Sequence, residues 1–313
     1  MKPVKLATLD VGTNTVLMLI AERDATGAVH AIADLARITR LGRGVDSSGR
    51  LDSEAAAQTL AAITEFAQKA RERGVEKIVG AATAALRDVK DGAGFIAQVK
   101  ARADVDLEII TGETEAQLSY LAVVRGLALD PAANLLIVDI GGGSTELIHA
   151  APGQKLELVS LQLGSVRLTE RLVHHDPPTA REAADLRLLV GEDLRQLGWE
   201  FTPGVMVGIA GTVTTICAVA LGLATYDARI VHGHRLSHQN VIAAIGKFGA
   251  LPLAERKRLP GLEAARADVI FAGAAILERI MDHFHMTEVV VSDQGVRWGL
   301  LWRTLDQSST SGN

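Results

Sequence analysis

The stretch LLIVDIGGGST, residues 135–145, decides the fold of this chain. An apolar run stops at Asp139 and three glycines, and a second apolar run, TELIHA, follows at once. This pattern predicts a strand, a tight turn and a returning strand. The stretch LATLDVGTNT, residues 6–15, has the same order around Asp10. Because the two stretches are separated by a domain-sized interval, they predict an internal duplication.

The composition is that of an aliphatic globular protein. The chain has 313 residues, of which 48% are hydrophobic, 22% charged and 4% aromatic, so it is neither disordered nor collagen-like. The net charge of -5 argues against general nucleic-acid binding. No apolar run reaches the length of a membrane span, so we expect no membrane segment. The single cysteine, Cys217, excludes an intrachain disulfide and, with no signal peptide, predicts a cytoplasmic location.

Strands and helices alternate on both sides of Asp130-Pro131, a dipeptide that interrupts helices. The alternation predicts an α/β fold. We expect an N-terminal domain over residues 1–128, a C-terminal domain over residues 129–306 and a flexible tail over residues 307–313.

Glycine turns that follow a strand expose backbone N–H groups, which bind phosphate oxygens. An Asp beside such a turn can hold Mg²⁺, which prefers oxygen ligands. A third turn of this kind, GIAGT, occupies residues 208–212. One such turn alone could equally be an Asp-capped β-turn, but three together predict phosphate binding. The candidate phosphate-binding residues are Gly12, Thr13, Asn14, Thr15, Gly141, Gly142, Gly143, Ser144, Gly211 and Thr212.

The order of these motifs resembles that of the actin/hexokinase superfamily and, more narrowly, that of the Ppx/GppA exopolyphosphatases. The narrower resemblance spans nearly the whole chain. It is carried by DVGTNT (10–15), TAALR (83–87), TGETEA (111–116), DIGGGSTEL (139–147), GIAGT (208–212), VHG (231–233), LPGLEAARADVI (259–270) and SDQGVRWG (292–299).

The resemblance implies two ribonuclease-H-like (actin-like ATPase) domains with an interdomain cleft. It also implies removal of terminal phosphate from inorganic polyphosphate or from guanosine pentaphosphate, with Mg²⁺ or Mn²⁺ as cofactor. Longer members continue into a further helical region, so this chain resembles a short two-domain form. That difference favours short polyphosphates, and guanosine pentaphosphate is the alternative substrate.

The resemblance assigns the catalytic base to Glu115, the glutamate before the Ala of TGETEA. An acid near a helix start is often only a partner of the helix dipole. However, hydrolysis of a phosphoanhydride needs an aligned water, which a carboxylate can orient and deprotonate. Many members carry two adjacent acids where this chain has Thr114-Glu115, and the second acid is retained.

Three further residues complete the expected catalytic set. Arg87 is expected to hold the transferring phosphoryl group, because a planar guanidinium can bind two oxygens. Taken alone, Arg87 could be a solvated surface residue. Asp139 and Glu146 flank the second glycine turn, where both can reach a metal or the attacking water. The candidate metal ligands are therefore Asp10, Asp139 and Glu146.

A basic segment follows the first pair of strands. Arg37, Arg40 and Arg43 would suit a polyanionic substrate. They could equally belong to a solvated loop in which the arginines meet acids elsewhere, which is the commoner situation.

Three histidines lie close together in the sequence, at His232, His234 and His238. We expect no metal cluster there, because the surrounding sequence has no carboxylate at a fitting spacing.

Two other functions compete with hydrolysis. One is an ATP-using kinase of the same superfamily, and the other is a sensor that binds polyphosphate or an alarmone without turnover. Retention of Glu115, Arg87, Asp139 and Glu146 argues against the sensor, because binding alone does not need all four. The sequence leaves a homodimer open.

Overall fold

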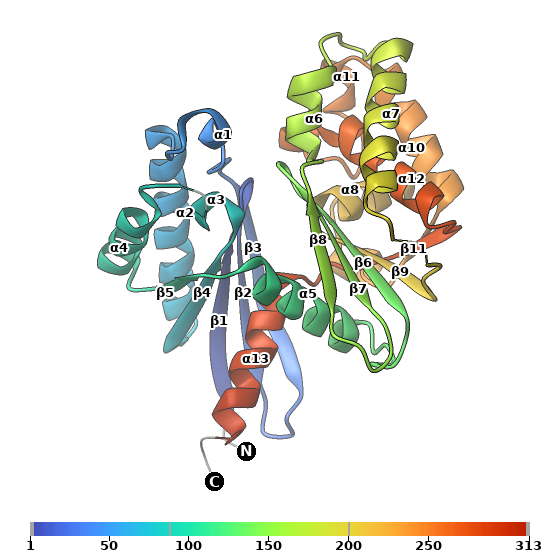
Figure 1. The fold of residues 1–313 in the computed structure, drawn as a ribbon. Coiled ribbons are helices and arrows are strands. Elements are labelled where there is room, and N and C mark those ends of the chain that lie inside the picture. Colours follow the sequence, from blue (N-terminus) through green and yellow to red (C-terminus); the bar gives the residue numbers. More distant parts are fainter. Residues whose placement is uncertain (1–2, 88, 200, 311–313) are drawn as a thin grey trace. The chain divides into compact units, whose positions relative to one another are not determined.

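A computed structural model describes residues 3–87, 89–199 and 201–310 and divides the chain into two compact units (Figure 1). Unit 1 comprises Met1–Ala122 and Gly295–Asn313, and unit 2 comprises Val123–Gln294. The chain therefore leaves unit 1 once and returns to it for its last helix.

Unit 1 is built on a five-stranded sheet in the order β3-β2-β1-β4-β5. The first three strands form an antiparallel meander, and β4 and β5 run parallel to β1. β1 is buried from Leu6 to Leu9 and at Val11, as expected for a strand that is covered on both faces. The strands are β1 (Val4–Val11), β2 (Thr15–Arg23), β3 (Val29–Ile38), β4 (Lys77–Ala82) and β5 (Asp106–Ile109).

Alternate residues of β1 pack against different helices, because successive side chains of a strand point to opposite faces. Leu9 joins a core with α2 (Ser53–Glu72) and α4 (Gly92–Ala103). Leu6 joins a core with α13 (Val296–Thr310). α5 (Gly112–Gly126) shares a smaller core with α13 and β4. The short helices α1 (Val45–Ser48) and α3 (Ala84–Arg87) follow β3 and β4.

Unit 2 repeats this arrangement. Its sheet has the order β10-β11-β9-β6-β7-β8, in which β6, β7 and β8 form the meander and β9 runs parallel to β6. Without β10 the order matches that of unit 1, so the predicted duplication is confirmed. The strands are β6 (Leu135–Ile140), β7 (Thr145–Ala150), β8 (Glu157–Leu161), β9 (Val205–Ile209), β10 (Arg235–Ser237) and β11 (Glu288–Val291).

α12 (Ile270–His283) is the central helix of unit 2 and is buried along most of its length. The helices around it are α6 (Ser165–Leu172), α7 (Ala180–Gln196), α8 (Ala210–Ala220) and α10 (His238–Ala250), whose buried side chains share its core. α9 (Ala228–Val231), α11 (Leu253–Arg256) and a 3₁₀ turn (Ala264–Arg266) connect them. Among the described residues, no helix combines the length and hydropathy needed to cross a membrane.

The last helix differs from the expected domain boundary. α13 belongs to unit 1, where Leu301 and Leu305 pack against Leu6 and Leu19. The apolar face of this helix is visible in the sequence, but its partner sheet is not. The helix also extends to Thr310, so residues 307–310 are helical rather than a tail. Residues 311–313 lie outside the described residues.

Candidate active site

The first loop, residues 11–15, joins β1 to β2 and is closed by a hydrogen bond from Gly12 N to Thr15 O (3.0 Å). Its carbonyl groups bond to the segment that follows β3. Thr13 O accepts from Gly42 N (2.8 Å), and Asn14 O accepts from Arg40 N (3.0 Å). These carbonyl groups of the loop therefore have their hydrogen-bond donors within unit 1.

The second loop, residues 140–145, has the same closure, from Gly141 N to Ser144 O (2.9 Å). Its carbonyl groups bond to the start of α6. Gly142 O accepts from Arg167 N (3.1 Å), and Gly143 O accepts from Arg167 Nε (2.7 Å). The loop and the segment before α6 approach so closely that a Cβ on Gly164 would lie 2.1 Å from Gly142 O. Only glycine fits there.

The hydrogen bonds of both loops suit an anion. A loop that binds phosphate turns amide N–H groups toward the ligand and carbonyl oxygens away from it. In each loop the carbonyl groups are held by the segment after the third strand of the meander. The two loops thus share a backbone arrangement that can accept phosphate oxygens.

The third loop, residues 208–212, is the direct junction of β9, which ends at Ile209, with α8, which begins at Ala210, and it lies beside the second loop. Thr212 Oγ1 donates to Ile140 O (2.8 Å), at the end of β6. Gly211 lies against the guanidinium of Arg266, since a Cβ on this glycine would approach Nη1 to 2.4 Å. The structure therefore brings Gly211 and Thr212 together with the second loop, as a shared phosphate-binding role would require.

Asp139 and Glu146 are register partners on β6 and β7. Ser160 is the register partner of Glu146 on β8, so the three side chains share one face of the sheet. Glu146 Oε1 accepts hydrogen bonds from Ser144 Oγ (2.6 Å) and Ser160 Oγ (2.9 Å). This face offers two carboxylates at the end of the β6–β7 pair, an oxygen set that a hard cation prefers.

Asp10 occupies the corresponding position in unit 1, but its register partner on β2 is Leu17. Burial raises the pKa of Asp10 to about 6, and the charge of Arg297 acts in the opposite direction. Asp10 Oδ1 is enclosed and has no hydrogen-bond partner within the described part of the chain. Such an oxygen fits Mg²⁺, because a cation would compensate the buried charge.

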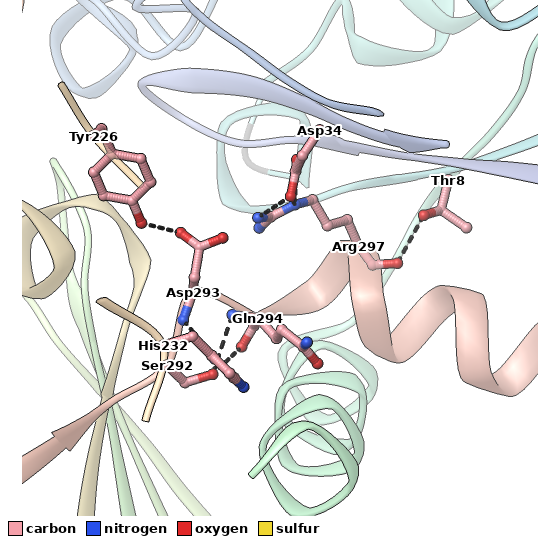
Figure 2. A network of polar contacts seen from close by, with 8 residues as sticks. All are labelled: Thr8, Asp34, Tyr226, His232, Ser292, Asp293, Gln294 and Arg297. Carbon is pink, nitrogen blue, oxygen red and sulfur yellow. Dashed lines mark hydrogen bonds and ion pairs between the residues drawn. The ribbon is translucent and has the colours of Figure 1, made fainter. Parts of the chain in front are cut away.

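Arg297 on α13 is itself held in place (Figure 2). Its Nη2 donates to Asp34 Oδ2 (2.8 Å), and its carbonyl oxygen accepts from Thr8 Oγ1 (2.7 Å). The side chain is 8% exposed, so its charge is fixed beside the carboxyl end of β1. Arg297 lies in the SDQGVRWG motif, but its position beside Asp10 was not predicted from the sequence.

The carboxyl ends of β1, β4 and β5 meet at one edge of the sheet of unit 1. Thr83 N donates to Val11 O (3.2 Å), and Ile110 N donates to Ala82 O (3.0 Å). In open α/β sheets, ligands bind at this edge. The edge carries the first loop after β1, α3 after β4 and α5 after β5.

Arg87 and Glu115 form an ion pair at this edge. Arg87 Nη1 lies 3.2 Å from Glu115 Oε2 and also donates to Ile110 O (2.8 Å). The two side chains are 30% and 19% exposed, so they are oriented by the protein and still reach solvent. The structure thus joins two of the residues that the resemblance assigned to catalysis.

The first turn of α5 separates the two candidate glutamates. Thr114 N donates to Thr111 Oγ1 (3.1 Å), which caps the helix. Glu113 is exposed, whereas Glu115 is half-buried and contacts Arg87. Only Glu115 has the fixed position that a base needs.

The arginines of the basic segment meet acids. Arg37 contacts Glu65 (2.6 Å), and Arg43 contacts Asp52 (2.5 Å) and Glu54 (3.0 Å). These ion pairs favour the solvated-loop alternative for Arg37 and Arg43.

Both ring nitrogens of His232 form hydrogen bonds with backbone groups (Figure 2 shows the residue). Its Nδ1 accepts from Asp293 N (3.2 Å), so Nε2 carries the proton and donates to Gly126 O (3.1 Å). Asp293 also accepts from the Tyr226 hydroxyl. The imidazole therefore links α5 to the segment after β11.

Sequence reasoning missed Arg167, Arg266 and Ser160, which contact the second and third loops. Arg266 lies in a motif quoted for the resemblance, so a signal existed. Arg167 and Ser160 have no such signal, because their role depends on pairing with residues distant in the chain.

Comparison with known proteins gives one consistent result. A family model described as the Ppx/GppA phosphatase family matches residues 19–308. Exopolyphosphatase 2 of Mycobacterium tuberculosis is 36% identical over 291 residues, which cover 88% of this chain and 89% of that protein. Exopolyphosphatase 1 of Mycobacterium bovis is 31% identical over 98% of this chain and 90% of its own length. The crystal structure of the Aquifex aeolicus Ppx/GppA family member aligns with a TM-score of 0.84, at 31% identity, over 98% of this chain and 99% of that one.

Proposed function

The chain belongs to the Ppx/GppA phosphatase family, and from this premise we propose that it is an exopolyphosphatase. It releases terminal orthophosphate from inorganic polyphosphate by attack of water on the last phosphorus. The observation that carries the proposal is the Arg87–Glu115 pair at the carboxyl edge of the first sheet. Relatives named exopolyphosphatase support polyphosphate as the substrate.

In this proposal the residues of unit 1 move the proton and hold the transferring group. Glu115 orients the attacking water and accepts its proton. Arg87 binds the equatorial oxygens of the transferring phosphoryl group, where charge accumulates in the transition state. The bond to Ile110 O keeps the guanidinium in place when its contact with Glu115 is exchanged for substrate.

The loops bind the remaining phosphates through backbone N–H groups, with the carbonyl groups held aside as described above. Mg²⁺ or Mn²⁺ is the proposed cofactor, and its proposed ligands are Asp10 in unit 1 and Asp139 and Glu146 in unit 2. A bound divalent cation would neutralise charge on the phosphate oxygens. Asp10 Oδ1 supports this assignment, because a buried oxygen without a hydrogen-bond donor is only partly compensated by the charge of Arg297.

Three finer points remain part of the proposal. Short polyphosphates are the proposed substrates and guanosine pentaphosphate is the alternative. The proposed location is the cytoplasm, based on a single cysteine that forms no intrachain disulfide. A homodimer stays a prediction that measurement of the mass in solution would decide.

Orthophosphate release tests the proposal. Short polyphosphate, long polyphosphate and guanosine pentaphosphate are compared at equal concentration of terminal phosphate, with Mg²⁺ and with a chelator. We expect release from polyphosphate, fastest from short chains, and only with the metal. Faster release from guanosine pentaphosphate would select the alternative substrate. Polyphosphate binding without release of orthophosphate would contradict the enzyme and support the sensor.

A further inference from the structure

Unit 2 contains a second group of side chains with metal-binding chemistry, formed by His238, Glu278 and Asp282. His238 is the first residue of α10, and Glu278 and Asp282 lie one turn apart on the neighbouring helix α12. One ligand atom from each residue lies within 4.8 Å of the other two. None of the three belongs to the proposed active site.

Glu278 gives this cluster its strongest signal. The residue is 1% exposed, and one of its carboxylate oxygens accepts a hydrogen bond from Arg187 on α7. The other oxygen, Oε2, is buried and has no hydrogen-bond partner among the residues described. A buried carboxylate oxygen without a donor is costly, unless a cation or another donor compensates it.

His238 supplies the second buried atom of the cluster that has no hydrogen-bond partner among the described residues. Its Nε2 is enclosed and makes no hydrogen bond within the described residues, although it lies 3.2 Å from Asp282 Oδ1. Ligand atoms around a tetrahedral Zn²⁺ are about 3.3 Å apart, from bond lengths of about 2.0–2.1 Å. The His238–Asp282 separation of 3.2 Å matches this spacing, and a ligand atom of Glu278 lies within 4.8 Å of both.

Each carboxylate of the cluster is also held by an arginine. Arg187 donates to Glu278 Oε1, and Arg279 Nη1 donates to Asp282 Oδ2 at 2.9 Å. The oxygens that remain are Glu278 Oε2, which has no hydrogen-bond partner among the described residues, and Asp282 Oδ1, which lies 3.2 Å from His238 Nε2. Outer partners of this kind fix the orientation of metal ligands in known sites.

We propose that His238, Glu278 and Asp282 bind a divalent transition-metal ion that connects α10 to α12. An imidazole nitrogen with two carboxylates suits Zn²⁺ or Mn²⁺ better than Mg²⁺, which prefers oxygen ligands alone. The side chains of His238 and Asp282 are 26% and 35% exposed, so an ion can enter from solvent and water can complete its coordination. This ion is separate from the cofactor of the proposed hydrolysis.

Zn²⁺ binding to the full chain tests the site. Protein freed of metal with a chelator is titrated with Zn²⁺ while Mg²⁺ in large excess occupies the carboxylates of the proposed active site. We expect one Zn²⁺ per chain and a higher melting temperature with Zn²⁺, because a ligand of the folded state stabilises it. His238→Gln should weaken this binding by about 10- to 100-fold or more, the scale seen when even an outer partner is lost.

His234→Gln is the matched control, since His234 belongs to no such cluster among the described residues. It should bind Zn²⁺ as the unaltered chain does. Asp282→Asn provides a second variant at a more exposed position, and far-UV circular dichroism without metal checks that each variant folds. Equal Zn²⁺ affinity in His238→Gln, Asp282→Asn and His234→Gln would overturn the proposal and leave an ion pair of His238 with Asp282. No substrate is present, so the result is independent of the exopolyphosphatase activity.

Discussion

The first loop places Asp10 opposite Leu17, whereas the second places Asp139 opposite Glu146. Their backbones are nevertheless alike, since a Gly N–H bonds to the carbonyl group three residues later in both. A Cβ on Gly12 or on Gly141 would meet that same carbonyl oxygen, at 3.3 and 3.2 Å. The duplication has kept the backbone of the loop and the Asp before it, while the residue opposite that Asp has diverged.

The same divergence extends along the two sheet edges. In unit 1, β4 and β5 are followed by Arg87 and Glu115, which form an ion pair. In unit 2, β9 is followed by Thr212, which bonds to the end of β6. Two matching glycine loops are thus surrounded by different side chains in the two units. The proposed base therefore belongs to unit 1, whereas two of the three proposed metal ligands belong to unit 2.

The largest expected effect comes from Glu115→Gln, which removes the proposed base from unit 1. The variant should lower kcat for polyphosphate by about 10²- to 10⁴-fold, because the amide cannot accept the proton of the attacking water. Steady-state orthophosphate release measures the effect. Glu113→Gln is the control, since that side chain is exposed on the same helical turn. Equal losses in the two variants would show that the base is misassigned.

Asp10→Asn tests the acid of the first loop, whose register partner is Leu17 and not a second acid. The pKa of Asp10 in the folded chain, about 6, lies above the ordinary value of 3.8. Between these pH values the folded chain therefore keeps a proton on Asp10 that the unfolded chain has lost. Stability of the metal-free chain should therefore fall as pH rises from about 4 to about 6, by up to about 3 kcal/mol. Asp10→Asn should remove this loss and be more stable than the unaltered chain at pH 7.5.

Urea unfolding with a chelator, at several pH values, measures the Asp10 effect. Addition of Mg²⁺ should stabilise the unaltered chain more than Asp10→Asn. A variant that is no more stable at pH 7.5, with the same pH dependence as the unaltered chain, would mean that Asp10 is solvated.

Asp139→Asn tests the acidic pair of the second loop. A neutral amide is a poorer partner for a hard cation, so the Mg²⁺ concentration for half-maximal rate should rise by about tenfold or more. The rate should recover in part at saturating metal. Asp185→Asn, an exposed change on α7, is the control and should have the metal dependence of the unaltered chain. An unchanged Mg²⁺ requirement in Asp139→Asn would remove this residue from the site.

The smallest expected effect concerns the segment that holds the first loop. Arg40→Gln with Arg43→Gln should raise KM for polyphosphate by about twofold at most and leave kcat nearly unchanged, because Arg43 is already paired with Asp52 and Glu54 and exposed charges each contribute little. The effect should grow with chain length and shrink as salt screens the charges. KM values equal to those of the unaltered chain at low salt, for every chain length, would show a solvated loop.

Apolar periodicity and glycine turns were enough to predict the strand–turn–strand units and the duplication. Both depend on residues close together in sequence, as in the stretch around Asp139. The family resemblance assigned Arg87 and Glu115 to catalysis, but their ion pair was not predicted, because two separate strands must lie side by side to bring them together.

Features that depend on distant partners were not predictable. The apolar face of α13 does not reveal that it covers β1. The charge of Arg43 does not reveal Asp52 and Glu54 across a turn. His238 lacks a carboxylate nearby in sequence, yet the packing of α10 on α12 supplies Glu278 and Asp282.

A Mg²⁺ titration of polyphosphate hydrolysis, with Glu115→Gln and Asp139→Asn side by side, tests the division between the units most directly. The account predicts that Glu115→Gln lowers the maximal rate and leaves the Mg²⁺ midpoint in place. It predicts that Asp139→Asn moves the midpoint to higher Mg²⁺ and regains rate at saturation. A midpoint that moves equally in both variants, or a maximal rate lost equally at saturating Mg²⁺, would contradict it.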